Sequence, residues 1–292
     1  MAKTPRILTG QVAAITGAAR GIGKETARAF VREGMKVAIG DLDLATAQET
    51  ARELGGGTIA IELNVTDRAS VAAFLDATEE QLGPIDVLVN NAGIMQLGPF
   101  ITEDDATAQR QVDINVHGVM FGMKEVLPRF HDRGRGHLVN IASSAGKGGF
   151  PGGATYCGTK HFVVGVSEAV RGELRGTNID VSCVMPGIVN TELAQGLHQA
   201  RGVKNINPED VAAGIVETLK HPRFDVYVPK SIGPISKVLS LLPRSGREAF
   251  VRVLKADTVL QVDPADRRAY ELRAARSEPG LESAEAQREL TT

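Results

Sequence analysis

Short apolar runs rich in β-branched residues alternate along the chain with longer helix-like segments, and this alternation limits the possible folds more than any other feature. Glycines that typically end helices stand at Gly34, Gly55 and Gly83, and helix starts are indicated at Asp67 and at Asn207, which a proline follows. A strand–helix–strand order favours a parallel sheet that is covered on both faces and wound in the right-handed sense. We therefore predict an α/β fold, a Rossmann-like doubly wound parallel sheet of about seven strands with helices on both faces. The predicted strands are 12–16, 36–40, 58–63, 85–90, 137–142, 179–185 and 225–229.

The character of the sequence changes near residue 230. Prolines at 234, 243 and 264 divide residues 231–277 into short helical pieces, and residues 278–290 are polar and mostly charged. We predict a main domain over residues 1–230, an appended helical segment over 231–277 and a polar, disordered tail over 278–292. The apolar stretch 235–242, "ISKVLSLL", has two interpretations: it covers a pocket or subunit interface, or it is an ordinary packing helix.

Composition excludes several functional classes. The formal net charge of −2 and the isoelectric point near 6.3 give no general attraction to nucleic acid or to anionic lipid. Two cysteines, Cys157 and Cys183, do not indicate a disulfide framework, and the N-terminus lacks an apolar signal region. No stretch approaches the roughly 18 apolar residues of a membrane span, and the six histidines show no metal-ligand spacing. We expect a soluble cytoplasmic protein without a metal, a membrane span or a nucleic-acid partner.

A glycine-rich turn, "TGAARGIGKE" at 16–25, follows the first predicted strand and opens a helix. Gly17, Gly21 and Gly23 allow the backbone to turn tightly and to approach a pyrophosphate, whose charge is met by free N–H groups at the helix N-terminus. A simple tight turn is the alternative. The position in the first strand–helix crossover favours dinucleotide binding.

Tyr156 and Lys160 stand four residues apart in a predicted apolar helix, so both lie on one helix face. A lysine lying along apolar surface beside a half-buried tyrosine would explain the pair without any chemistry. Alternatively, the ammonium lowers the pKa of the phenol, ordinarily about 10, and the phenol acts as a general acid or base.

Six motifs, in sequence order, resemble those of the short-chain dehydrogenase/reductase family. They are Thr16-Gly-x-x-x-Gly-x-Gly23, "NNAG" at 90–93, Asn115 in "DINVHG", Ser143 in "IASSAG", Tyr156-x-x-x-Lys160 and "PGIVNT" at 186–191. The resemblance covers residues 10–230 and does not extend to the C-terminal segment. It implies an oxidoreductase that transfers a hydride between a nicotinamide dinucleotide and a secondary alcohol or ketone, assembled as a homodimer or homotetramer.

The resemblance also implies catalytic roles. Tyr156 would exchange a proton with the substrate oxygen, while Lys160 tunes the phenol and holds the nicotinamide ribose. Ser143 and Ser144 compete as donors to the substrate oxygen, and the spacing of 13 residues before the tyrosine selects Ser143. Asn115 would link the lysine to solvent through water, or else occupy a bend in its helix.

Further positions resemble cofactor contacts of the family. Asn64 departs from the pattern, because an aspartate usually stands there beside the adenine ring. The full set of expected cofactor-binding residues is Gly17, Arg20, Gly21, Ile22, Gly23, Asp41, Asn64, Val65, Asn91, Ala92, Gly93, Tyr156, Lys160, Pro186, Gly187, Ile188 and Thr191.

Two charged residues argue in opposite directions on the choice of cofactor. Asp41, at the end of the second predicted strand, would accept hydrogen bonds from the adenosine ribose and repel a 2′-phosphate, which favours NAD. Arg20 in the glycine turn would neutralise that phosphate, which favours NADP. Asp41 would have to move away before Arg20 could help, so we predict NAD, with NADP less favoured. A helix N-cap is the alternative role of Asp41, and Asp43 is better placed for it.

Segments that border the substrate cleft of the family are mostly apolar here, so we expect a lipophilic secondary alcohol or ketone as the substrate. An NADP-dependent carbonyl reductase is the alternative within the enzyme class. A non-catalytic dinucleotide-binding regulator is the alternative outside it, and such a protein would be expected to lack Tyr156 or Lys160. The bordering residues are Ile94, Met95, Leu97, Phe100, Phe150, Pro151, Leu193 and Leu197.

Overall fold

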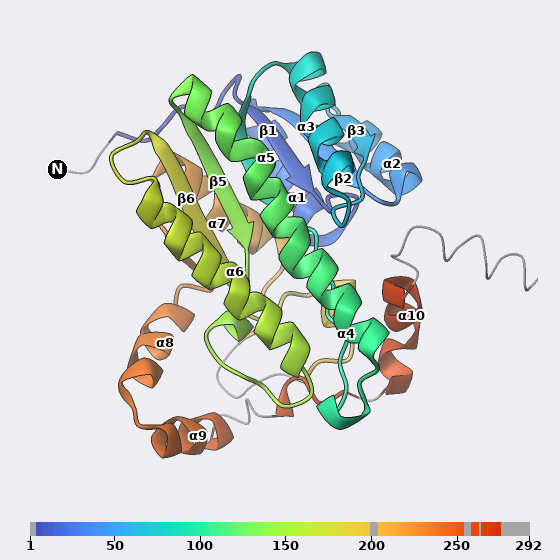
Figure 1. The fold of residues 1–292 in the computed structure, drawn as a ribbon, viewed down its shortest axis with the longest axis vertical. Helices are drawn as coiled ribbons and strands as arrows, with labels where there is room; N and C mark the ends of the chain where they lie inside the picture. Colours follow the sequence, from blue (N-terminus) through green and yellow to red (C-terminus); the bar gives the residue numbers. More distant parts are fainter. Residues whose placement is uncertain (1–3, 199–203, 254–257, 263, 276–292) are drawn as a thin grey trace, which may run out of the picture.

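A seven-stranded parallel sheet forms the centre of the molecule, in the spatial order β3-β2-β1-β4-β5-β6-β7 (Figure 1). This computed structural model describes residues 4–198, 204–253, 258–262 and 264–275. All seven predicted strands are confirmed, with ends that differ by one residue or match. They are β1 (Val12–Thr16), β2 (Lys36–Asp41), β3 (Ile59–Glu62), β4 (Ile85–Asn90), β5 (Gly136–Ile141), β6 (Ile179–Pro186) and β7 (Asp225–Val228).

Helices cover both faces of the sheet, as predicted. One face carries α1 (Gly21–Arg32), α2 (Leu44–Leu54) and α7 (Pro208–Lys220), and the other carries α3 (Arg68–Leu82), α5 (Gly118–Arg133) and α6 (Ala154–Glu173) (Figure 1). A short helix, α4 (Asp105–Val112), continues through a π-helical turn (Asp113–His117) into α5.

Each central strand sends alternate side chains into two separate cores. In β1, Ala13 and Ile15 pack with the side of α1 and α7, whereas Val12 and Ala14 pack with the side of α3 and α5. All four side chains are at most 4% exposed. Burial on both faces explains why the strand is apolar throughout rather than alternating.

The predicted helix ends are confirmed by their contacts. Asp67 accepts a hydrogen bond from the amide of Ala69 at the start of α3, and Asn207 forms a capping box with Asp210 at the start of α7. Gly55 follows α2 with a φ of +64°, a conformation that favours glycine.

The order of the strands reverses at β1. The chain moves outward from β1 through β2 to β3 and then returns, so that β4 pairs with the other side of β1. The loops that leave the carboxyl ends of β1 and β4 therefore diverge at adjacent positions. Open parallel sheets bind ligands at such a point.

Among the residues described after the sheet, three helices are present, which confirms the helical character of the C-terminal segment. They are α8 (Ile232–Leu241), α9 (Arg244–Val253) and α10 (Pro264–Ala275), with prolines at or near their boundaries (Figure 1). The predicted tail at 278–292 lies outside the described residues, and the division of the chain at residue 230 remains a prediction. Within the described part of the chain, no helix is long and apolar enough to cross a membrane.

Candidate active site

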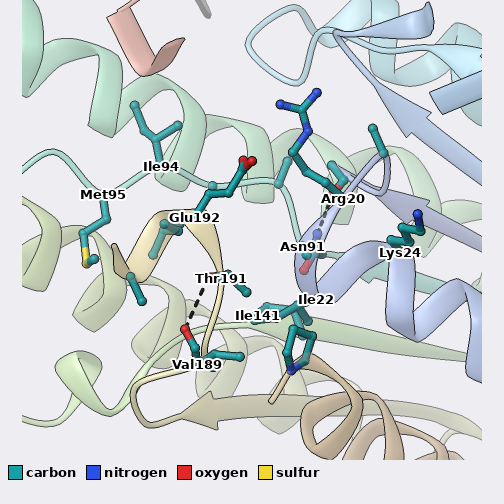
Figure 2. A pocket seen from close by; sticks show the side chains of 18 of the residues that line it. Arg20, Ile22, Lys24, Asn91, Ile94, Met95, Ile141, Val189, Thr191 and Glu192 are labelled. Atoms are coloured by element: carbon teal, nitrogen blue, oxygen red, sulfur yellow. Dashed lines mark hydrogen bonds between the residues drawn. The ribbon is translucent and has the colours of Figure 1, made fainter. Parts of the chain in front are cut away.

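A cavity of about 2150 Å³ opens at the carboxyl ends of the strands, where the strand order reverses. It brings together the glycine turn, the end of β2 and the loops that follow β4, β5 and β6. In Figure 2, Arg20 and Lys24 lie at one end of it, and Ile94 and Met95 lie at the other. All the expected site residues line the cavity except Gly23 and Asn115.

The glycine turn is shaped by close backbone contacts. Gly17 has a φ of +63°, and a Cβ atom there would lie 2.6 Å from the Cα atom of Ala92. A Cβ atom at Gly23 would lie 2.5 Å from the carbonyl oxygen of Gly17, so neither position admits another residue without a shift. The turn leads into the N-terminus of α1, where free N–H groups favour an anion. This backbone cradle fits the pyrophosphate of a dinucleotide.

Thr16 and Asn91 join the ends of β1 and β4 beneath this turn. The Oγ1 atom of Thr16 accepts hydrogen bonds of 3.0 Å from the amides of Asn91 and Ala92. The Nδ2 atom of Asn91 donates to the carbonyls of Thr16 and Gly17 at 2.9 and 2.8 Å. Thr16 begins the glycine motif, but the sequence alone gives it no role. Its position as the last residue of a strand before the glycine turn was the available signal.

The end of β2 carries the group expected to meet the adenosine ribose. The carboxylate of Asp41 accepts from the amide of Ala19 at 2.9 Å and from the amide of Asp43 at 3.1 Å. Burial raises the pKa of Asp41 above its ordinary value, although both backbone hydrogen bonds oppose the shift. Asp43 caps α2 by accepting from the amide of Thr46, which confirms that Asp43 is the N-cap. Arg20 pairs with Asp43 at 2.5 Å.

Tyr156 and Lys160 are buried on one face of α6, 6% and 5% exposed. The phenol is hydrogen-bonded to the side chain of Ser143, and the ammonium lies 5.8 Å from the centre of the phenol ring. Lys160 donates to the carbonyl of Ile141 at 3.0 Å. The structure thus brings three of the four expected catalytic side chains together, and the serine that meets the phenol is Ser143.

The protonation of this pair differs from the sequence-based expectation. Burial raises the pKa of Tyr156 to about 12, and the hydrogen bond from Ser143 opposes the shift. Burial also lowers the pKa of Lys160 to about 8. In the protein alone, the ammonium therefore does not lower the pKa of the phenol below its ordinary value, because the cost of burying a charge outweighs the attraction.

Asn115 lies in the π-helical turn, fully buried, and does not line the cavity. Its amide group accepts from the N–H of Ile94 and donates to the carbonyl of Ile94, each at 2.9 Å. It also donates to the hydroxyl of Thr159 on α6 at 3.1 Å. Asn115 therefore holds the loop after β4 against the helix that carries the tyrosine and lysine.

An apolar cluster surrounds the phenol at the far end of the cavity. Met95, Val259 and Leu260 are at most 8% exposed and pack with Tyr156. The partly buried members of this cluster are Leu97, Phe150, Ile188, Leu193 and Leu197. Phe100 and Pro151, two of the residues expected to border the cleft, are exposed and do not line the cavity.

The interpretation of the stretch 235–242 as a cover for the pocket is wrong. Among the residues that the structure describes, those of α8 do not line the cavity. Val259, Leu260 and five residues of α10, among them Tyr270, line it instead. The sequence indicated the proline at the start of α10 but carried no local signal that this helix would reach the site, because the contacts join residues more than 170 positions apart.

The described part of the chain contains no group of three or more histidine, cysteine, aspartate or glutamate side chains that could hold a metal ion.

The chain is similar to known proteins. The family model described as short chain dehydrogenase matches residues 11–202. A galactitol 2-dehydrogenase from Agrobacterium fabrum is 40% identical over 220 residues, which cover 74% of this chain and 86% of that protein. A glycine betaine reductase from Emericella nidulans is 34% identical over 227 residues, which cover 74% of this chain and only 18% of that protein.

A solved structure extends the likeness to the fold. A short-chain dehydrogenase/reductase from Burkholderia phymatum, in complex with NAD, matches with a TM-score of 0.74 and 26% identity over 80% of this chain and 93% of that chain. The chain therefore belongs to the short-chain dehydrogenase/reductase family of oxidoreductases, which act on CH–OH groups with NAD(P).

Proposed function

We propose that this protein is an NAD-dependent oxidoreductase that interconverts a lipophilic secondary alcohol and its ketone. The observation that carries the proposal is the position of Tyr156, which lies between the dinucleotide cradle and an apolar cluster within one cavity. A bound dinucleotide supplies the hydride acceptor or donor for such a reaction. A non-catalytic regulator is disfavoured because Tyr156, Lys160 and Ser143 are gathered beside the cradle.

The residues present fit a dinucleotide. The cradle at Gly17 and Gly23 would receive the pyrophosphate, and Asp41 would accept hydrogen bonds from the adenosine ribose. Each oxygen of Asp41 accepts one backbone hydrogen bond, which leaves further lone pairs for the ribose. Lys160 would hold the nicotinamide ribose. The pairing of Arg20 with Asp43 supports NAD over NADP, since Arg20 is already engaged by a carboxylate.

The proton is assigned to the phenol. With a pKa of about 12, Tyr156 is protonated at neutral pH and is ready to donate its proton to a ketone oxygen. Ser143, hydrogen-bonded to the phenol, would donate to the same oxygen and hold it in place. For alcohol oxidation, the phenol would have to lose its proton before it could accept one from the alcohol.

The apolar cluster supports a lipophilic substrate. The galactitol dehydrogenase that this chain resembles is named for a polyol, and a polyol would need polar partners at each hydroxyl. Met95, Leu193, Val259 and Leu260 supply apolar surface instead. Each methylene buried there is worth about 0.8 kcal/mol, or roughly fourfold in kcat/KM.

A homologous series of ketones tests this proposal. With NADH, kcat/KM should rise from 2-butanone through 2-octanone to 2-dodecanone until the apolar end is filled. Oxidation of galactitol with NAD should be much weaker than oxidation of 2-octanol. Equal values along the ketone series, or preferred oxidation of galactitol, would show that the substrate is not lipophilic.

We also propose a homodimer or homotetramer, on the family resemblance. The chain has a mass of 31.0 kDa, so light scattering coupled to size exclusion would separate both assemblies from a monomer.

A further inference from the structure

Two successive residues of the loop after β4, Ile94 and Met95, have their backbone groups bound by side chains from other elements. Asn115 binds both backbone polar groups of Ile94. Helix α10 binds both backbone polar groups of Met95. The amide of Met95 donates to the hydroxyl of Tyr270 at 2.8 Å, and the carbonyl of Met95 accepts from Arg267 at 2.6 Å. A loop that carries one wall of the substrate end is thus fixed from the catalytic side and from the C-terminal helix.

Arg267 is the residue that makes this connection. It is fully buried, and its guanidinium also donates to the carbonyls of Leu193 and Gln195 at 3.0 and 2.8 Å. Its Nε atom donates to Glu271 at 3.0 Å. Burial of a charge is costly unless it is paired and hydrogen-bonded, and this guanidinium meets both conditions. A planar group with five donors suits three carbonyls and a carboxylate, whereas a lysine would not.

The same helix is seated closely on the loop after β6. A Cβ atom at Gly196, whose φ is +77°, would lie 3.2 Å from the Cβ atom of Asp266 and 3.3 Å from the Cγ atom of Arg267. The ring of Tyr270 lies 4.6 Å from the guanidinium. Helix α10 therefore contacts both loops that border the substrate end, one after β4 and one after β6.

We propose that Arg267 is a positioning residue that docks α10 onto these two loops and thereby sets the selectivity of the site for long apolar substrates. This inference rests on the proposed function. The docked helix closes the apolar end formed by Met95, Leu193 and Leu260, which is remote from the dinucleotide cradle. Loss of the guanidinium should loosen the wall that a long chain contacts, while a short ketone, bound beside Tyr156, would not depend on it.

The test compares Arg267→Met with Arg268→Met, a control on the neighbouring, exposed position of the same helix. In Arg267→Met, kcat/KM for 2-dodecanone should fall at least about tenfold, the size expected for one charge-assisted hydrogen bond, mainly through KM. The value for 2-butanone and the affinity for NADH should stay within about twofold of wild type, because neither a short ketone beside Tyr156 nor the dinucleotide depends on this wall. Arg268→Met should behave as wild type. An equal loss for both ketones would show a general structural role and overturn the proposal.

A smaller change guards against misfolding. Tyr270→Phe removes a single oxygen atom, which accepts from the amide of Met95, so it should reduce the preference for 2-dodecanone in the same direction. If neither variant changes the ratio of kcat/KM between the two ketones, the proposal is wrong.

Hydrogen exchange separates this inference from the proposed function. Arg267→Met should speed amide exchange in residues 91–98 and 193–197, and Arg268→Met should not. If wild type reduces no ketone, the proposed substrate class fails while faster exchange still supports the docking role. Unchanged exchange in Arg267→Met would overturn the docking role whatever the substrate.

Discussion

Burial pushes Tyr156 and Lys160 toward their uncharged forms, in the absence of a ligand. The pKa of the phenol is raised to about 12, and the pKa of the ammonium is lowered to about 8. Both shifts oppose the charged pair that the sequence predicted. Burying a lysine in this way lowers the stability of the folded state but holds the side chain where the site needs it. Such a loss of stability is common at active sites.

Replacing the phenol tests its assigned role. Tyr156→Phe should lower kcat with 2-octanone and NADH by about 10²–10⁴-fold, the usual range for lost general acid–base catalysis. Folding and the affinity for NADH should be retained, since the ring still fills its buried position. Turnover close to that of wild type would rule out Tyr156 as the proton donor.

Lys160 should limit stability at neutral pH. Its pKa is about 8 in the folded chain against 10.5 in the reference state, so below pH 8 both states carry the proton and the folded state bears the cost of burial. At 1.36 kcal/mol per pKa unit, offset by the lost hydrogen bond to Ile141, Lys160→Met should raise the free energy of unfolding by about 1–3 kcal/mol at pH 7. The difference in the free energy of unfolding between the variant and wild type should disappear between pH 8 and 10.5, because wild type gains stability over that range.

Urea unfolding at pH 7.0 and 9.5, without cofactor, would measure this difference. Lys160→Met should also be inactive, so a gain in stability with a loss of turnover is the expected combination. A variant less stable than wild type at pH 7.0 would contradict the burial cost assigned to the ammonium.

We expect one carboxylate, that of Asp41, to decide the choice between NAD and NADP. We expect wild type to prefer NAD by at least about tenfold in kcat/KM, or roughly 1.4 kcal/mol, because Asp41 would repel a 2′-phosphate. Asp41→Ser should narrow or reverse this preference, with Arg20 then free to leave Asp43. Steady-state kinetics with both cofactors decide the matter, and a wild-type preference for NADP would favour the carbonyl-reductase alternative.

At the scale of the elements, the contact between β5 and β6 contains a buried titratable side chain, His137. His137 on β5 is 4% exposed and lies 2.8 Å from the hydroxyl of Ser182 on β6. Burial lowers its pKa to about 4, with Asp180 opposing the shift and Arg6 adding to it. The histidine therefore stays neutral in the folded sheet while the unfolded chain titrates near 6.5.

Because His137 stays neutral when it is buried, we expect the folded protein to lose stability as the pH falls below 6.5. Between pH 6.5 and 4 the unfolded chain binds a proton that the folded chain does not, so the free energy of unfolding should fall as the pH falls, by up to about 3 kcal/mol from this residue. His137→Gln should flatten that slope, and His131→Gln, at an exposed position, should not. Denaturant unfolding from pH 7 to 4 would measure the slopes; equal slopes in His137→Gln and wild type would refute the assignment.

At the scale of the whole molecule, the C-terminal helices complete a cavity that the sheet begins. The cradle comes from the first strands, the phenol and ammonium from α6, and the cover from α10. Elements from both ends of the chain therefore contribute to one site, and ligand binding should stabilise the molecule as a unit.

A thermal-shift measurement tests whether ligand binding stabilises the whole molecule. NADH at 100 times its dissociation constant should add about 2.7 kcal/mol to the stability of the folded state and raise Tm by several degrees. Asp41→Ala should reduce the rise at the same NADH concentration, whereas Arg268→Met should leave it unchanged. An NADH-independent Tm in wild type would contradict dinucleotide binding.

The features that the sequence determined are local ones. The seven strands, the helix ends at Asp67, Asn207 and Gly55, and the glycine turn all depend on residues within a few positions of one another, where backbone sterics and side-chain periodicity decide the outcome. The spacing of four residues between Tyr156 and Lys160 likewise puts both on one face of α6, independently of any tertiary contact. The ordered motifs predicted a dinucleotide site at the turn after β1, and this turn lines the cavity.

Only the tertiary structure decided what surrounds those residues. The pairing of Arg20 with Asp43 joins residues 23 positions apart, and the bond from Arg267 to Met95 joins residues 172 positions apart. The direction of the pKa shifts of Tyr156 and Lys160 also depends on burial, which the local spacing does not contain. The spacing of residues in the sequence indicates which side chains share one face of a helix or strand. Solvent exclusion and long-range contacts arise only when all the elements pack together.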